Sequence, residues 1–158
     1  MDLDMQLSLD IKGKKFDGNI RDIMKINEAI LTEEFVKQPG TYAWFAALME
    51  IASAEIDSKK FNLSVLEANL DKEKRVFLSK DGKVTEAMVR SAIITDKIYI
   101  DLNTELLEIS RQYGILKAIV RSLEQRKDML IQIGSMKRTE LSLGDFNIDM
   151  DKVREKHK

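Results

Sequence analysis

The sequence has no cysteine, one histidine and one proline among its 158 residues. Without cysteine there is no disulfide framework and no thiolate metal ligand, which suits a reducing compartment. The single histidine, His157, is the next-to-last residue of the sequence. One histidine at that position does not provide a histidine-based acid–base pair or a histidine metal cluster. We therefore expect a protein that is not an enzyme and that needs neither a metal nor a cofactor.

Phosphate-binding loops and long apolar runs are also missing. The seven glycines fit neither a phosphate-binding loop nor a dinucleotide fingerprint. Asp145, Asp149 and Asp151 lack the glycine and glutamate spacing of a calcium loop. No run reaches the roughly 18 apolar residues of a membrane span, and Asp2 and Asp4 do not suit a signal peptide. These absences predict a cytoplasmic protein that does not interact with membranes.

What the sequence does contain is two stripes of apolar residues at alternating three- and four-residue spacing. The first is Phe45, Met49, Ala52, Ile56, Leu63, Leu66, Leu70 and Phe77. The second is Leu102, Leu106, Ile109, Tyr113, Leu116, Val120, Leu123 and Leu130. A 3.5-residue repeat sustained over about five heptads is typical of helices that supercoil against a partner. The predicted fold is mainly α, a long antiparallel helical hairpin of residues 41–79 and 97–134.

Charged residues interrupt both stripes. Lys59 and Glu73 stand at seam positions of the first stripe, and Lys127 stands at one of the second. A charge in the seam disfavours a simple two-helix zipper. The interruptions therefore favour a larger assembly in which these charges are paired or solvated.

Shorter elements are predicted beside the hairpin. Residues 2–12 and 145–151 alternate apolar and polar side chains, which predicts short β-strands near both ends of the chain. Pairing of the two strands within one subunit and addition to a neighbouring subunit both stay open. Gly13–Gly18 predicts a turn, and the periodicity of Asn19–Lys37 predicts a short helix that ends at the Pro-Gly pair behind it.

Capping residues predict the other boundaries. Thr41 is an N-cap candidate for the first long helix, and Thr85 is one for a short helix between the long ones. Thr95 and Asp96 offer a cap for the second long helix, and Gly134-Ser135 predicts its end. We expect one domain over residues 1–158, with a flexible tail at 152–158.

Charge is divided unevenly along a chain whose net charge is −1. Residues 1–57 hold six basic and eleven acidic residues, whereas residues 109–138 hold seven basic and two acidic ones. Candidate polyanion contacts at the predicted hairpin tip are Lys72, Lys74, Arg75, Lys80 and Lys83, and those on the second long helix are Arg111, Lys117 and Arg121. Lysine and arginine on rigid helices track phosphates without reading bases. The alternative interpretation is salt bridges between subunits beside the seam.

A resemblance to a known family adds to this prediction. The run Tyr113–Gly134, YGILKAIVRSLEQRKDMLIQIG, resembles the second long helix of UvsY-like recombination mediators of tailed bacteriophages. Ile100–Leu106 fits the approach to that helix. Tyr42–Phe45 and the basic stretch Leu66–Gly82 resemble the first long helix. The resemblance covers residues 27–138 and is one of pattern and layout.

The resemblance implies a ring-like homo-oligomer that binds single-stranded DNA during phage recombination and repair in the host bacterial cytoplasm. Its protein partners would be a RecA-type recombinase, which it helps to load, and the single-strand-binding protein that is replaced. By position, Lys72, Lys74 and Arg75 would contact DNA, and the second helix would contribute to assembly. The strand-like ends depart from the family pattern. A helical adaptor or assembly chaperone that binds no DNA, and a metal-dependent enzyme, remain as alternatives.

Overall fold

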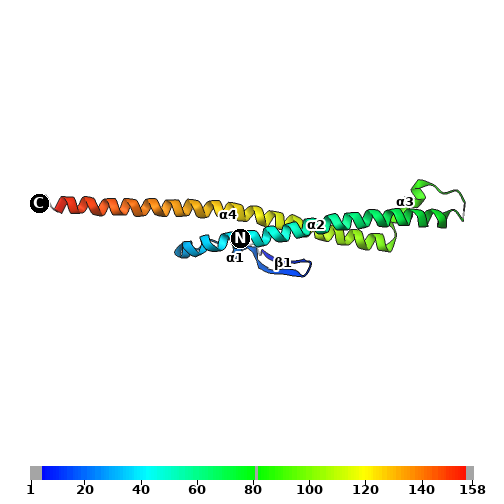
Figure 1. The fold of residues 1–158 in the computed structure, drawn as a ribbon, viewed down its shortest axis with the longest axis horizontal. Coiled ribbons are helices and arrows are strands. Elements are labelled where there is room, and N and C mark those ends of the chain that lie inside the picture. Colours follow the sequence, from blue (N-terminus) through cyan, green and yellow to red (C-terminus); the bar gives the residue numbers. More distant parts are fainter. Residues whose placement is uncertain (1–4, 81, 156–158) are drawn as a thin grey trace. The chain divides into compact units, whose positions relative to one another are not determined.

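The computed structural model describes residues 5–80 and 82–155, and these residues are mainly helical. The elements in chain order are β1 (Gln6–Ile11), β2 (Lys14–Asn19), α1 (Ile20–Met24), the 3₁₀ helix η1 (Glu28–Ile30), α2 (Leu31–Leu78), α3 (Glu86–Ile94) and α4 (Lys97–Glu155). Figure 1 shows these elements, of which α2 and α4 are the two long helices. The predicted mainly α fold is therefore confirmed.

The described residues form two compact units, each with its own apolar core. The first unit contains the described parts of residues 1–7, 18–45 and 119–158. The second unit contains residues 8–17 and the described parts of 46–118.

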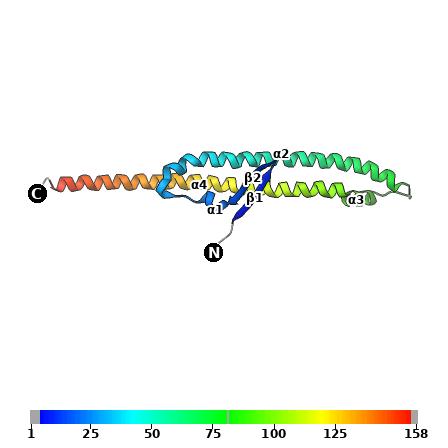
Figure 2. The same ribbon diagram turned by 90° about the horizontal axis from the view of Figure 1, so that it is seen from below.

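In the second unit, α2 packs antiparallel against α4, as Figure 2 shows. Cross-contacts follow that direction, because Lys59 meets Glu105 while Glu67, further along α2, accepts a 2.9 Å hydrogen bond from the earlier Tyr99. The core contains side chains that are less than a tenth exposed, and these are Leu9, Ile11, Leu48, Ala52, Ile56, Leu70, Val89, Ile109 and Leu116. Most of them belong to the predicted stripes, so the stripe pattern located this core. Among the stripe residues, Phe77 is the one that is exposed, with 62% of its surface accessible.

The seam charge at Lys59 finds partners within its own chain. Its Nζ lies 2.6 Å from Glu105 and 3.8 Å from Glu55, and only 18% of its side chain is exposed. Glu73 and Lys127 are mostly solvent-exposed instead. The interruptions of the stripes therefore need no larger assembly to accommodate them.

The N-terminal strand pairs with its immediate neighbour, and the predicted turn at Gly13–Gly18 is wrong. Lys12 and Gly13 both adopt positive φ angles, 49° and 77°, which is the backbone of a two-residue hairpin turn. The following residues then form β2 and pair with β1 in a two-stranded sheet. The Oδ1 atom of Asp10 accepts a 3.0 Å bond from the Gly13 amide and stabilises the turn. Residues 2–4 of the predicted strand lie outside the described residues.

The predicted starts of α3 and α4 are confirmed. The Thr85 side chain accepts a hydrogen bond from the Met88 amide at the N-terminus of α3. Asp96 accepts one from Ile98 at 3.0 Å at the start of α4. Both are side-chain caps that satisfy amides left free by the first helical turn.

In the first unit, the helix predicted at Asn19–Lys37 is divided, and Pro39 does not end it. Asn19 caps α1, and Lys25 and Asn27 are extended before η1 leads into α2. Pro39 lies inside α2, and the Thr41 hydroxyl donates to the Lys37 carbonyl instead of capping a helix. A proline removes one helical hydrogen bond, so contacts of the adjacent turn with α4 must offset that loss.

α4 continues past Gly134 to Glu155, so both the predicted end at Gly134-Ser135 and the predicted strand at 145–151 are wrong. A Cβ atom at Gly134 would lie 3.1 Å from the Phe35 ring, which shows that this glycine permits close packing within the first unit. Apolar residues in 141–153 also recur at three- and four-residue spacing, a period that fits a helix as well as a strand. Residues 152–155 are helical, and 156–158 lie outside the described residues.

Candidate nucleic-acid interface

The basic residues predicted at the hairpin tip lie at the C-terminal end of α2 and in the turn before α3, within the second unit. They divide into two kinds. Lys72, Lys80 and Lys83 are exposed, and none forms an ion pair with any side chain in 5–80 or 82–143. Lys74 and Arg75 are bonded to carboxylates. All five belong to the last turns of α2 and the turn after it, but only three are available to a phosphate without first giving up a carboxylate partner.

Lys74 joins the end of α2 to the start of α4. Its Nζ donates to Asp96 at 2.8 Å, and about a fifth or less of either side chain is exposed. The hydrogen bond with Asp96 raises the pKa of Lys74, and the same bond lowers the pKa of Asp96. Asp96 also caps α4, so Lys74 stabilises the helix start that follows the turn. This geometry assigns Lys74 a structural contact within the unit.

Arg75 joins α2 to α3 through paired hydrogen bonds. Its guanidinium donates to Glu86 at 2.6 and 2.8 Å and to Asp71 at 2.8 and 3.1 Å. Planar guanidinium–carboxylate pairing of this kind is geometrically specific. The bonds raise the pKa of Arg75 and lower those of Glu86 and Asp71. We call Asp71, Arg75 and Glu86 the α3 clasp.

The predicted contacts on α4 also differ from one another. Arg111 donates to Glu108 at 2.7 and 2.9 Å, and this bond holds the pKa of Glu108 at about 2. Lys117, in the second unit, and Arg121, in the first, are exposed and form no ion pair with the side chains of 5–80 or 82–143. The charge of Arg111 is therefore partly compensated by Glu108 on the same helix. Lys117 and Arg121 have no such carboxylate partner among the side chains of 5–80 and 82–143.

Two residues near the turn were missed by the sequence prediction. Phe77 and Lys97 line one groove of the second unit together with Lys74 and Asp96. The sequence assigned Phe77 to the apolar seam because its spacing continues the stripe. The sequence pattern did not predict a site at Lys97, because Lys97 reaches the end of α2 only when α3 and α4 fold back beside it.

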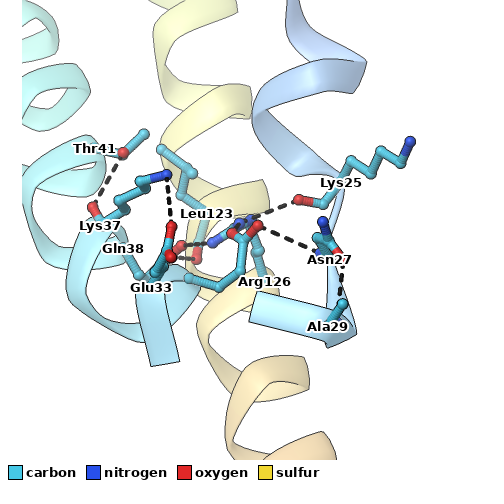
Figure 3. A network of polar contacts seen from close by, with 10 residues as sticks. Lys25, Asn27, Ala29, Glu33, Lys37, Gln38, Thr41, Leu123 and Arg126 are labelled. Atoms are coloured by element: carbon cyan, nitrogen blue, oxygen red, sulfur yellow. Dashed lines mark hydrogen bonds and ion pairs between the residues drawn. The ribbon is translucent and has the colours of Figure 1, made fainter. Parts of the chain in front are cut away.

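A buried polar network in the first unit was also missed, and Figure 3 shows it. Arg126, only 7% exposed, donates to Glu34, to Gln38 and to the Lys25 carbonyl, while Gln38 donates to the Leu123 carbonyl at 2.7 Å. The buried Nε of Arg126 has no hydrogen-bond partner among the described residues. This network fixes α2 against α4 within the unit, so the excess basic charge of 109–138 includes one arginine that is not at the surface.

Other kinds of site find no support in the described part of the chain. The side chains of residues 5–80 and 82–143 include no group of three or more histidine, cysteine, aspartate or glutamate residues placed to hold a metal. No helix within that part is both long and apolar enough to span a membrane. Comparison of the chain with protein-family models, with curated proteins and with solved structures found no match.

Proposed function

We propose that this protein binds single-stranded DNA and acts as an oligomeric recombination mediator that helps to load a RecA-type recombinase. The observation that carries the proposal is the group of three exposed lysines, Lys72, Lys80 and Lys83, around the end of α2, which have no carboxylate partner among the side chains of 5–80 and 82–143. Lys72 lies on α2, and Lys80 and Lys83 lie in the turn that follows it. Exposed lysines bind a phosphate backbone without sequence preference. The recombination role rests on the resemblance of Tyr113–Gly134 to UvsY-like mediators.

The structure changes which residues should be tested first. Lys74 and Arg75 hold α4 and α3 in place, so their replacement would disturb the fold of the turn together with any DNA contact. Lys72, Lys80 and Lys83 have no such role in the described structure. Their replacement therefore separates binding from folding.

The test is binding of a fluorescein-labelled oligo(dT) strand by fluorescence anisotropy at several salt concentrations. We expect Lys72→Ala/Lys80→Ala/Lys83→Ala to weaken binding and to reduce the dependence of log Kd on log salt by roughly two to three ion equivalents. The control is Lys14→Ala/Lys15→Ala/Lys60→Ala, which removes three exposed lysines elsewhere in the second unit, of which Lys15 lies 3.7 Å from Asp10. Equal effects of the two triple variants would show that Lys72, Lys80 and Lys83 do not form the binding site. No binding by the wild type at low salt would refute the proposal.

A helical adaptor is the second candidate, and exposed apolar side chains favour it. In the second unit, Phe61, Val65 and Val76 of α2 and Ile98 and Leu107 of α4 are each between 44% and 67% exposed. Exposed apolar residues suit contact with another protein or with a second copy of the chain where they form a continuous patch. Light-scattering mass measured with and without the oligonucleotide distinguishes the two candidates. An oligomer that takes up DNA supports the mediator, and an oligomer that does not supports the adaptor.

A further inference from the structure

Phe77 is placed where a buried seam residue was expected, yet its ring faces solvent. It occupies the last turn of α2, and 62% of it is exposed. The stripe ends in effect at Leu70, which is 5% exposed. The ring therefore contributes little to the core of the second unit.

The groove beside this ring contains two lysines, Lys74 and Lys97, and two carboxylates, Glu73 and Asp96. Lys74 and Lys97 line the same groove as Phe77, and Lys80 follows in the turn, where its amide donates to the Phe77 carbonyl at 3.4 Å. Of the two carboxylates in the groove, Asp96 is bonded to Lys74 and to the first turn of α4. Glu73 remains as a partial counterweight, 3.8 Å from Lys74. Lys97 is the lysine of the groove that forms no ion pair with the side chains of 5–80 or 82–143. Proteins use an exposed aromatic ring beside such a cation to stack an unpaired base while binding its phosphate.

We infer that Phe77 stacks on an unpaired nucleobase and makes this surface prefer single-stranded over duplex nucleic acid. The inference rests on the proposed function and adds the residue that selects the type of strand. Lysines attract both forms of DNA, because both carry phosphates. In a duplex each base is already stacked on its neighbours and is shielded, so an exposed ring gains contact only with a single strand.

The first experiment compares Phe77→Ala with the wild type on oligo(dT) and on a duplex of the same length. We expect an about tenfold loss of affinity for the single strand, with duplex affinity and the salt dependence unchanged, because no charge is removed. Phe77→Tyr should restore binding, since its ring also stacks. Phe61→Ala and Val76→Ala are matched controls, as these side chains are 67% and 65% exposed and should leave affinity unchanged.

The second experiment reports contact with the ring directly. Phe77→Trp in a Trp44→Phe background leaves one tryptophan, at the position of interest. We expect oligo(dT) to quench its fluorescence and a duplex to leave it nearly unchanged. Far-ultraviolet circular dichroism of each variant shows whether the helices are retained.

The outcomes separate this inference from the proposed function. If the wild type binds oligo(dT) and a helical Phe77→Ala variant binds equally well, the stacking role is refuted and the DNA-binding proposal stands. If Phe77→Ala weakens single-strand and duplex binding alike, the ring is not selective and the inference is refuted. If the wild type binds neither form, both proposals are refuted.

Discussion

The guanidinium of Arg75 forms two hydrogen bonds to the carboxylate of Glu86, at 2.6 and 2.8 Å, and thereby joins α2 to α3. α3 has nine residues and buries only Val89 completely, so polar contacts add to the little packing that holds it in place. The predicted DNA contact Arg75 is therefore first a residue of the fold.

Glu86→Gln tests the α3 clasp. Loss of the carboxylate charge should speed amide hydrogen exchange in α3 by roughly two- to fivefold, because Glu86 is largely exposed and such pairs contribute modestly. Exchange measured by mass spectrometry on α3 peptides checks this result. Glu73→Gln is the control, since Glu73 is exposed and does not bond to Arg75. Equal exchange in the two variants would show that the clasp does not hold α3.

Acid should release the same contacts. Pairing with Arg75 lowers the pKa of Glu86 and of Asp71 below their ordinary values of 4.5 and 3.8. A lowered folded-state pKa means that the stabilisation is complete above the ordinary value and is lost as pH falls through the lowered one. The difference in melting temperature between the wild type and Glu86→Gln should therefore be constant at pH 5–8 and disappear towards pH 2. A difference that persists at pH 2 would contradict this explanation.

Base should act on the contact of Lys74 with Asp96. That contact raises the pKa of Lys74 above its ordinary 10.5, so its stabilisation is complete below that value and is lost as pH rises through the raised pKa. The two windows together predict an interval from about pH 4.5 to 10.5 in which all contacts around the turn persist. Thermal unfolding followed by circular dichroism across this range checks the plateau, and a maximum confined to neutral pH would argue against it.

The buried network of Arg126 should be costly to break. Arg126→Ala leaves Glu34 and Gln38 without their partner, and we expect a loss of about 3–5 kcal/mol in the free energy of unfolding. Lys127→Ala, at the exposed neighbouring position, should change stability by no more than about 0.5 kcal/mol. Denaturant unfolding measures both.

A second variant distinguishes the cost of an unpaired buried charge from the loss of the network's hydrogen bonds. Arg126→Met/Glu34→Leu/Gln38→Leu removes the whole polar group, and apolar replacement of a complete buried pair is often neutral or stabilising. We expect it to recover most of the loss seen in Arg126→Ala. A triple variant as unstable as the single one would show that the network contributes through its bonds and not only through the cost of a broken pair.

Pro39 should be a destabilising residue in its present place. It lies inside α2, where proline removes one hydrogen bond and costs up to about 3 kcal/mol. Pro39→Ala should therefore raise the melting temperature while the Gln38 bond to Leu123 stays available. Lower stability of the alanine variant would show that the proline ring itself contributes to packing.

Much of the fold follows from local sequence signals. The apolar stripes located the buried faces of α2 and α4 at Ala52, Ile56, Leu116 and Leu123. Thr85 and Asp96 marked helix starts, because side-chain capping is decided by residues within one turn. The alternation of β1 predicted a strand, although its partner was found only in the structure.

Two of the failures share a cause, which is that tertiary contacts override local preference. Pro39 stays helical where Gln38 is bonded to α4, and Gly134 stays helical where Phe35 packs against it. A short alternating run such as 145–151 fits either period, so its pattern alone does not distinguish the helix found here from a strand.

The sequence by itself determined the helical hairpin and the concentration of basic residues near the end of α2, because periodicity and charge are local properties. The tertiary structure alone decided which of those charges are available. Arg75 and Lys74 are bonded to carboxylates that α3 and α4 bring back beside α2, whereas Lys72, Lys80 and Lys83 remain exposed. That distinction depends on distances between segments far apart in the chain, which spacing along the sequence does not encode.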